Sequence, residues 1–237
     1  MSHYNKNGFT IIELMLAMGF VASLLLAIAM TVIQIGNIYN RGITYNDVNQ
    51  AGSALAVELQ RSINSSSPFD VNLKNADGTA NTNSMYKPTS WGGRLCTGQY
   101  SYVWNYGKAI LDPLGGLNRY IASADSIHFV KVIDTGKDLC SSPSSGVIKT
   151  SAIELLSQGQ NNLAIHSFSI TSSAYDEKTG QRLYNISFTL GTNEQSALNG
   201  DNTKCLLENE FKSNPSYCAI NDFSIVARAG NIASVAE

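Results

Sequence analysis

Length, composition and charge set the first limits on this chain of 237 residues. Only 14% of the residues are charged, and the formal net charge is −2. This length accommodates one soluble domain beside a long helix, whereas two domains would be crowded. Binding to nucleic acid needs clustered basic residues, so nucleic acid is not an expected partner, although a local basic patch is left open.

The N-terminal region changes abruptly from a polar segment to an apolar one. Residues 14–40 contain no Asp, Glu, Lys, Arg or His, and these 27 residues exceed the roughly 20 that a helix needs to cross a hydrocarbon core. The charges before the run are Lys6, in the polar segment, and Glu13, at the head of the apolar segment. This pattern predicts a helix that can span a membrane.

Two simpler interpretations compete for this segment. A secretory signal peptide would use Ala27-Ile28-Ala29 as its cleavage site, but the apolar stretch before that site is too long and has an acid at its head. A plain membrane anchor explains the length but not Glu13, because an acid within a membrane is costly and usually has a partner.

The residues at the head of the apolar run resemble the processing site of type IV pilins and of the pseudopilins of type II secretion. They read Gly8-Phe9-Thr10-Ile11-Ile12-Glu13-Leu14-Met15. The resemblance implies that residues 1–8 are a leader, that a prepilin peptidase cleaves between Gly8 and Phe9, and that Phe9 is then N-methylated. No catalytic residue in this chain is implied.

Glu13 has a role in the same resemblance. A helix starting at Phe9 would place this acid one turn from the new α-amino group, and a carboxylate in low dielectric strongly favours a nearby cation. In the family, the acid is taken to pair with the amino terminus of a neighbouring subunit during assembly. The alternative is an acid that reaches the polar edge of the membrane.

The helical pattern continues beyond the apolar run while it becomes polar. Residues 9–36 form the predicted transmembrane and assembly half, and residues 37–64 form an amphipathic half with one apolar stripe at Val48, Gly52, Leu55, Leu59 and Ile63. The stripe is expected to pack on the soluble domain. Ser65 to Pro68 should end the helix, because proline cannot continue the hydrogen-bond ladder.

Residues 65–237 are predicted to form an extracytoplasmic head, rich in β-structure. The first part, residues 65–98, is interpreted as a linker-like region. Within it, the run from Asn75 to Asn83 places oxygen ligands at alternate positions, as calcium loops do, but it lacks the bidentate Glu of an EF-hand. A solvated loop is the favoured interpretation, and no metal or other cofactor is expected.

Beyond residue 98 the apolar residues recur with a period of two, which indicates strands. The alternating sets are Tyr100, Tyr102, Trp104 and Tyr106; Ile127, Phe129 and Ile133; residues 166–171; and Tyr184, Ile186, Phe188 and Leu190. Residues 176–180 are expected to form a hairpin loop, and residues 151–156 a short helix. The predicted fold class is therefore α+β, with a long N-terminal helix packed on one face of an antiparallel sheet whose other face is exposed, as in pilins.

Four cysteines lie in the predicted head. An even number in an exported domain favours disulfides, and the simplest pairing is Cys96 with Cys140 and Cys205 with Cys218, although other pairings stay open. A zinc site would need ligand spacing that is absent, since His128 and His166 are isolated on predicted strands.

No motif for catalysis is present, so the chain is not expected to be an enzyme. The resemblance implies a minor pilin of the W/J type, on segments 39–41, 49–52 and 59–63, and the absence of a proline near Met30 departs from many major pilins. Implied partners are other pilins, prepilin peptidase, and the assembly platform with its ATPase. The expected location is the inner membrane first and an extracellular filament later.

Three alternatives remain open. A type II secretion pseudopilin would have the same leader and helix. A DNA-binding subunit of a competence pilus would need a basic, aromatic patch on the head. A membrane-tethered binding or enzymatic domain outside any filament would keep its leader.

Overall fold

The computed structural model describes residues 10–111, 119–120, 127–141, 147–148, 152–156, 162–206 and 217–230. The predicted leader and its cleavage site at Gly8 and Phe9 therefore lie outside the described residues. The elements are α1 (Ile11–Asn64), β1 (Tyr86–Pro88), β2 (Gly92–Cys96), β3 (Tyr100–Asn105), α2 (Gly107–Leu111), β4 (Arg119–Tyr120), β5 (Phe129–Ile133), α3 (Asp138–Ser141), β6 (Val147–Ile148), β7 (Ala152–Glu154), β8 (Leu163–Asp176), β9 (Gln181–Thr192), the 3-10 turn η1 (Gln195–Ala197) and β10 (Ile220–Ala229). The fold is α+β, as predicted.

Helix α1 is one uninterrupted helix of 54 residues, about 81 Å long at about 1.5 Å per residue. It begins at Ile11 and not at Phe9, because Thr10 adopts an extended conformation and caps the helix. The Thr10 backbone N–H and hydroxyl donate to Glu13 Oε2 at 3.0 and 2.9 Å, and the Glu13 N–H donates to Thr10 Oγ1 at 3.3 Å. This reciprocal capping box fixes the start of the helix. The helix ends at Asn64, as predicted.

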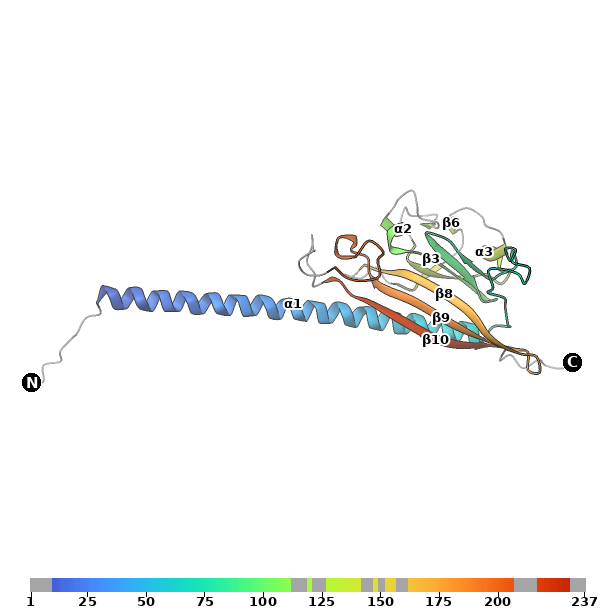
Figure 1. Cartoon of the computed structure of the whole chain (residues 1–237), viewed down its shortest axis with the longest axis horizontal. Coiled ribbons are helices and arrows are strands. Elements are labelled where there is room, and N and C mark those ends of the chain that lie inside the picture. Colours follow the sequence, from blue (N-terminus) through green and yellow to red (C-terminus); the bar gives the residue numbers. More distant parts are fainter. Residues whose placement is uncertain are drawn as a thin grey trace, which may run out of the picture.

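Figure 1 shows that the N-terminal half of α1 projects from the head, whereas the C-terminal half lies along it. The buried residues of the helix lie in its C-terminal half and include the predicted stripe, Val48, Gly52, Leu55, Leu59 and Ile63. At Gly52, an added Cβ would lie 2.1 Å from the Phe223 ring, so glycine is what allows β10 to approach the helix this closely. The amphipathic half therefore holds the head, as the periodicity predicted.

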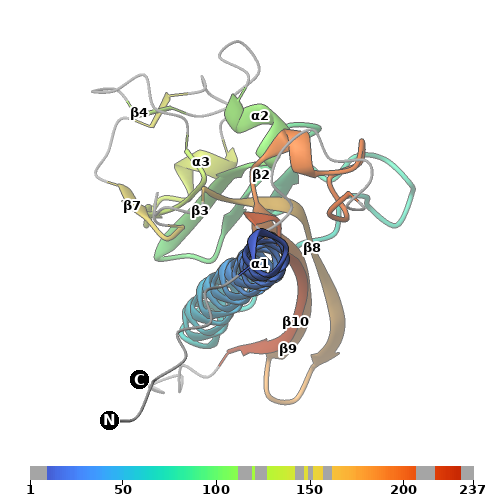
Figure 2. The same ribbon diagram turned by 90° about the vertical axis from the view of Figure 1, so that its left-hand side faces the viewer.

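A three-stranded antiparallel sheet, in the order β10-β9-β8, packs on the helix. Figure 2 looks along α1 and shows these strands curving around one side of it. The hairpin between β8 and β9 is the predicted one, and Gly180 takes a φ of +66° in its loop, which glycine adopts without steric cost. On β9, the predicted inward set, Tyr184, Ile186, Phe188 and Leu190, is buried. Asn185 and Ser187, between them, are exposed.

A second antiparallel sheet, in the order β1-β2-β3-β5-β7, packs over the same core. Trp104 on β3 joins the two sheets, with its ring centroid 5.4 Å from that of Phe129 and 4.3 Å from that of Phe168 on β8. The opposite face of this second sheet is also covered, because Val103, Ile127, Val130 and Val132 form a separate buried cluster. The expectation of one half-exposed sheet thus holds for β8–β10 and is wrong for the second sheet.

The interpretation of residues 65–98 as a linker is wrong. This region supplies β1 and β2, and it also packs Phe69, whose ring stacks on that of Tyr184 at 4.6 Å. The Phe69 N–H donates to the Tyr184 hydroxyl at 2.8 Å, and that hydroxyl donates to the Phe69 carbonyl at 2.6 Å. Long-range pairing with β3 and β9 thus overrides a local composition typical of loops.

Three other local predictions also need correction. The short helix expected at residues 151–156 is instead strand β7, over residues 152–154, which pairs antiparallel with β5 through Val132 and Ala152. Ile127 and Ile133 do not share a buried face with Phe129, since Ile127 packs in the second cluster and Ile133 is 68% exposed. Strand β10 was not predicted, although Phe223, Ile225, Ala227 and Ala229 alternate with polar or exposed residues along it.

Candidate functional site

The most unusual surface of the molecule is the N-terminal half of α1, residues 11–38, here called the free half. Every residue from Ile11 to Ile35 is exposed. Its exposed large apolar side chains are Ile11, Ile12, Leu14, Met15, Leu16, Met18, Phe20, Val21, Leu24, Leu25, Leu26, Ile28, Met30, Val32, Ile33, Ile35 and Ile38. A contiguous apolar surface of this size on a soluble protein marks a site that binds another hydrophobic surface.

The free half is apolar on all sides. A helix of this kind is stable when it is buried in a large core or in a membrane. Its two hydroxyl groups beyond the first turn are hydrogen-bonded within the helix, since the Ser23 hydroxyl donates to the Phe20 carbonyl at 2.8 Å and the Thr31 hydroxyl donates to the Ile28 carbonyl at 2.8 Å. Such internal hydrogen bonds remove the cost of placing these hydroxyls in hydrocarbon.

Helix α1 is long enough and apolar enough to cross a membrane. None of its most apolar 18-residue window is buried against the rest of the chain, which distinguishes it from the core helix of a soluble domain. The charge-free residues 14–40 would extend about 40 Å, against about 30 Å for a hydrocarbon core.

Glu13 lies at the first turn of the free half and is exposed. Its carboxylate accepts the two hydrogen bonds from Thr10 described above, so it completes the cap of its own helix. This cap was not predicted, although Thr10-x-x-Glu13 is the sequence signature of a capping box. The predicted pairing of Glu13 with an α-amino group at Phe9 involves a residue outside the described part of the chain and stays a prediction.

Side chains from α1 fasten the head to the helix along the outer edge of β10. The Gln60 amide donates to the Val226 carbonyl at 2.9 Å, and the Asn64 amide oxygen accepts from the Arg228 N–H at 3.1 Å. Asn221 donates to Asn49 at 2.7 Å. The bonds to Val226 and Arg228 occupy backbone groups at an edge that would otherwise be open to pairing with another strand.

An ion pair fastens α1 to the second sheet. Glu58 Oε1 lies 2.5 Å from Lys131 Nζ and accepts from the Tyr102 hydroxyl at 3.0 Å. Burial opposes ionisation of Glu58, but the hydrogen bonds from Lys131 and Tyr102 outweigh it and lower the pKa of this carboxyl. Helix α1 thus makes polar contacts with both sheets of the head, at β10 and at the second sheet. The free half projects beyond these contacts.

All four cysteines are paired. Cys96 forms a disulfide with Cys140, and Cys205 with Cys218, which are the sequential pairs that the sequence predicted. The first joins β2 to α3, and the second closes a short loop before β10. Disulfides occur in exported domains, so this chemistry agrees with a head outside the cytoplasm.

The segment from Asn75 to Asn83 uses its own oxygens internally. Asp77 Oδ1 accepts from the Thr79 N–H at 2.9 Å and from the Thr79 hydroxyl at 2.6 Å, and the Asn75 amide donates to the Thr79 hydroxyl at 3.0 Å. Among the described residues, no group of three or more His, Cys, Asp or Glu side chains could hold a metal ion. The loop is therefore a self-bonded turn.

The two histidines of the head are both hydrogen-bonded to backbone carbonyls, and His128 is buried whereas His166 is partly buried. His128 Nδ1 lies 2.6 Å from the Leu163 carbonyl, and His166 Nε2 lies 3.1 Å from the Thr192 carbonyl. His166 lies on β8, as predicted, whereas His128 directly precedes β5. Their separate backbone partners indicate a structural role.

The partly buried histidine on β8 predicts a pH-dependent stability. Burial lowers the pKa of His166 to about 4, below the usual value of 6.5. Because the unfolded chain then binds the proton first, stability is lost as pH falls from about 6.5 towards 4. We expect the free energy of unfolding to fall by roughly 2 kcal/mol between pH 7 and pH 5, measured by urea unfolding. In His166→Gln this slope should flatten, and an unchanged slope would contradict the assignment.

The candidate site is thus the exposed apolar free half of α1, with Glu13 in its first turn and the head packed on the other half of the helix. Comparison with protein-family models, curated proteins and solved structures finds no match to this chain.

Proposed function

We propose that this chain is a structural minor subunit of a type IV pilus-like filament, stored in the membrane and then assembled through the free half of α1. The observation that supports this most strongly is the projection of an apolar helix, exposed on all sides, from a head against which the described structure buries residues of the other half of α1. The motif from Gly8 to Glu13 at its start adds a processing site.

Two hydrophobic environments would cover the free half in turn. In the membrane, lipid surrounds it, and in the filament, the same side chains pack against sister helices. The 17 large apolar side chains of the free half would cost on the order of tens of kcal/mol to expose to water. The transfer therefore has to be direct, and an ATPase-driven platform supplies the work.

Processing before assembly follows from the position of the motif. A prepilin peptidase would cleave between Gly8 and Phe9 and leave the whole apolar helix in the mature chain. The new amino group would then lie close in sequence to Glu13, the acid that starts the helix. Glu13 would pair with the amino group of a neighbouring subunit once both lie in the apolar core of the filament.

A minor role is favoured over that of the main subunit. The free half contains no proline, and α1 is continuous through the position of Met30, where many major pilins have one. The head is also large for a major pilin, which suits a subunit at or near the tip. Such a subunit would help to start assembly and be present in few copies.

The test is the composition of filaments sheared from cells that express the full chain with its assembly machinery. We expect the chain in the filament fraction at well below one copy per major subunit, measured by quantitative mass spectrometry. Its absence there, with normal membrane insertion, would contradict the proposal. A protein-secretion assay on the deletion strain distinguishes a type II secretion pseudopilin, whose loss would stop secretion.

A further inference from the structure

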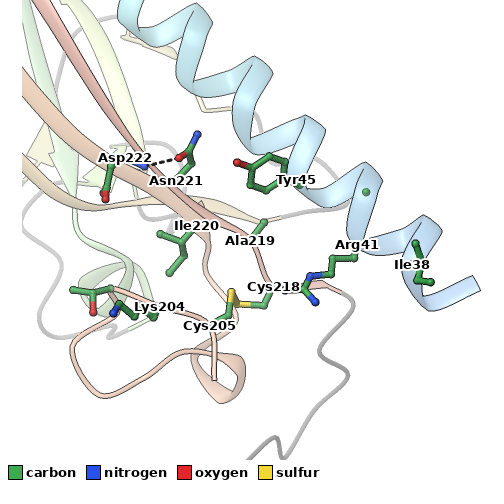
Figure 3. A pocket seen from close by; sticks show the side chains of 12 residues that line it. Ile38, Arg41, Tyr45, Lys204, Cys205, Cys218, Ala219, Ile220, Asn221 and Asp222 are labelled. Atoms are coloured by element: carbon green, nitrogen blue, oxygen red, sulfur yellow. Dashed lines mark hydrogen bonds between the residues drawn. A yellow bond between two sulfur atoms is a disulfide. The ribbon is translucent and has the colours of Figure 1, made fainter. Parts of the chain in front are cut away.

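A pocket of about 660 Å³ lies where the free half of α1 meets the head. Figure 3 shows its two sides, with Ile38, Arg41 and Tyr45 from α1 on one side and the Cys205–Cys218 disulfide and the start of β10 on the other. The pocket thus lies between α1 and the residues next to the Cys205–Cys218 disulfide.

The lining combines apolar walls with basic groups. Ile38 and Tyr45 supply apolar surface, while Arg41 and Lys204 supply positive charge. Asp222 also lines the pocket, but it lies at the end opposite Arg41 in Figure 3, and its Oδ1 accepts from the Thr189 hydroxyl at 2.6 Å. Among the residues that the structure describes, Arg41 makes no ion pair. Its guanidinium is one of the two positive charges that line the pocket.

The position of Arg41 along the helix points to the nature of that ligand. Arg41 is the first charged residue after Glu13, and their separation of 28 positions corresponds to about 42 Å of helix. A bilayer including both headgroup regions is about 40–45 Å thick. With Glu13 at one surface of the membrane, Arg41 therefore lies among the headgroups of the other.

Tyrosines lie at the same level as Arg41. Tyr39, Tyr45 and Tyr217 are about half exposed or more, and the Asn40 amide lies 3.5 Å from the Tyr217 hydroxyl. Tyrosine is enriched where membranes meet water, because its ring is apolar and its hydroxyl is polar. The base of the head thus has the composition of a surface that rests on lipid headgroups.

We propose that this pocket binds the phosphate of an anionic phospholipid in the extracytoplasmic leaflet while the chain is stored in the membrane. The Arg41 guanidinium would hold the phosphate through paired N–H donors, and Ile38 would contact the upper acyl chain. This proposal rests on the proposed function, because it requires the chain to be stored in the membrane. The lipid would have to be released on assembly. The free energy of this contact therefore adds to the free energy needed to extract the subunit from the membrane.

The experiment uses the full chain in lipid nanodiscs that contain equal amounts of phosphatidylglycerol and phosphatidylcholine. Native mass spectrometry then counts the lipids that stay bound. We expect one retained phosphatidylglycerol, and about fivefold less retention in Arg41→Gln, the effect expected for one basic residue at an anionic surface. Lys178→Gln, which removes an equal charge from the β8–β9 hairpin loop, should retain lipid as the parent does.

Each other outcome overturns the proposal. Equal retention of the two lipids, or equal loss in both variants, would show no specific site. Displacement of the bound lipid by millimolar inorganic phosphate would make free phosphate the ligand. Loss of filament incorporation by Arg41→Gln with unchanged lipid retention would assign Arg41 to a contact with a neighbouring subunit. Failure of the parent chain to insert would remove the proposed function as well, whereas insertion without lipid preference removes only this site.

Discussion

Glu13→Val is expected to leave the chain inserted in the membrane but to reduce its recovery in sheared filaments by at least about a hundredfold. Valine lowers the cost of insertion, since it removes the acid at the head of the apolar run. In the filament, however, a neighbouring amino group would be left buried without its partner, which costs about 3–5 kcal/mol. Recovery is measured by immunoblotting of sheared filaments against the membrane fraction.

Glu13→Gln separates the charge of this residue from its capping role. Glutamine can still accept from the Thr10 N–H and hydroxyl, so the helix should begin at the same residue. It cannot pair with a cation as a carboxylate does. We therefore expect Glu13→Gln to fail in assembly as Glu13→Val does, whereas normal assembly of the glutamine variant would assign Glu13 to capping alone.

Trp104→Ala is expected to lower the free energy of unfolding of the head by about 4 kcal/mol. The side chain is fully buried and contacts Phe129 on the same sheet and Phe168 on the other. Its removal leaves a cavity at the junction of the two sheets, and large aromatic truncations of this kind cost about 3–5 kcal/mol.

Trp91→Ala is the matched control, because Trp91 is 41% exposed and its truncation leaves no enclosed cavity. We expect a loss of about 1 kcal/mol or less from this variant. Both are measured by urea unfolding of the full chain in detergent, followed by near-ultraviolet circular dichroism. Equal losses in the two variants would contradict the core described here.

The elements that local pattern alone determines could be predicted from the sequence. The stripe from Val48 to Ile63 repeats at helical spacing and is buried as expected. The β8–β9 hairpin has a recognisable loop sequence at residues 176–180, and its alternating apolar residues from Tyr184 to Leu190 are buried as expected. In both cases the residues that decide the structure are neighbours in the sequence.

The elements that were not predicted correctly are strands whose pairing partners are distant in the sequence. Residues 86–88 and 92–96 form strands because β3 pairs with β2, and the Asn- and Ser-rich surroundings give no local sign of this. Residues 152–154 form an edge strand on β5, where three residues are too few for a periodic signal. Strand β10 has a weak periodic signal around Ile225, but its residues become a strand through pairing with β9.

One part of the candidate site could likewise be predicted from the sequence, and another part could not. Its apolar rod and Glu13 could be read directly from residues 13–40, because their chemistry is contiguous. The pocket at Arg41 could not, since Lys204 lies 163 positions later in the chain and is brought near the helix by the tertiary fold. The start of α1 at Ile11 is a smaller case, decided by the Thr10–Glu13 cap.

The most direct test of the account is the mass of the mature amino terminus in cells that contain a prepilin peptidase. We expect a chain that begins at Phe9, carries one N-methyl group and retains the whole of α1. A chain that begins after Ala29, or one that keeps residues 1–8, would contradict it.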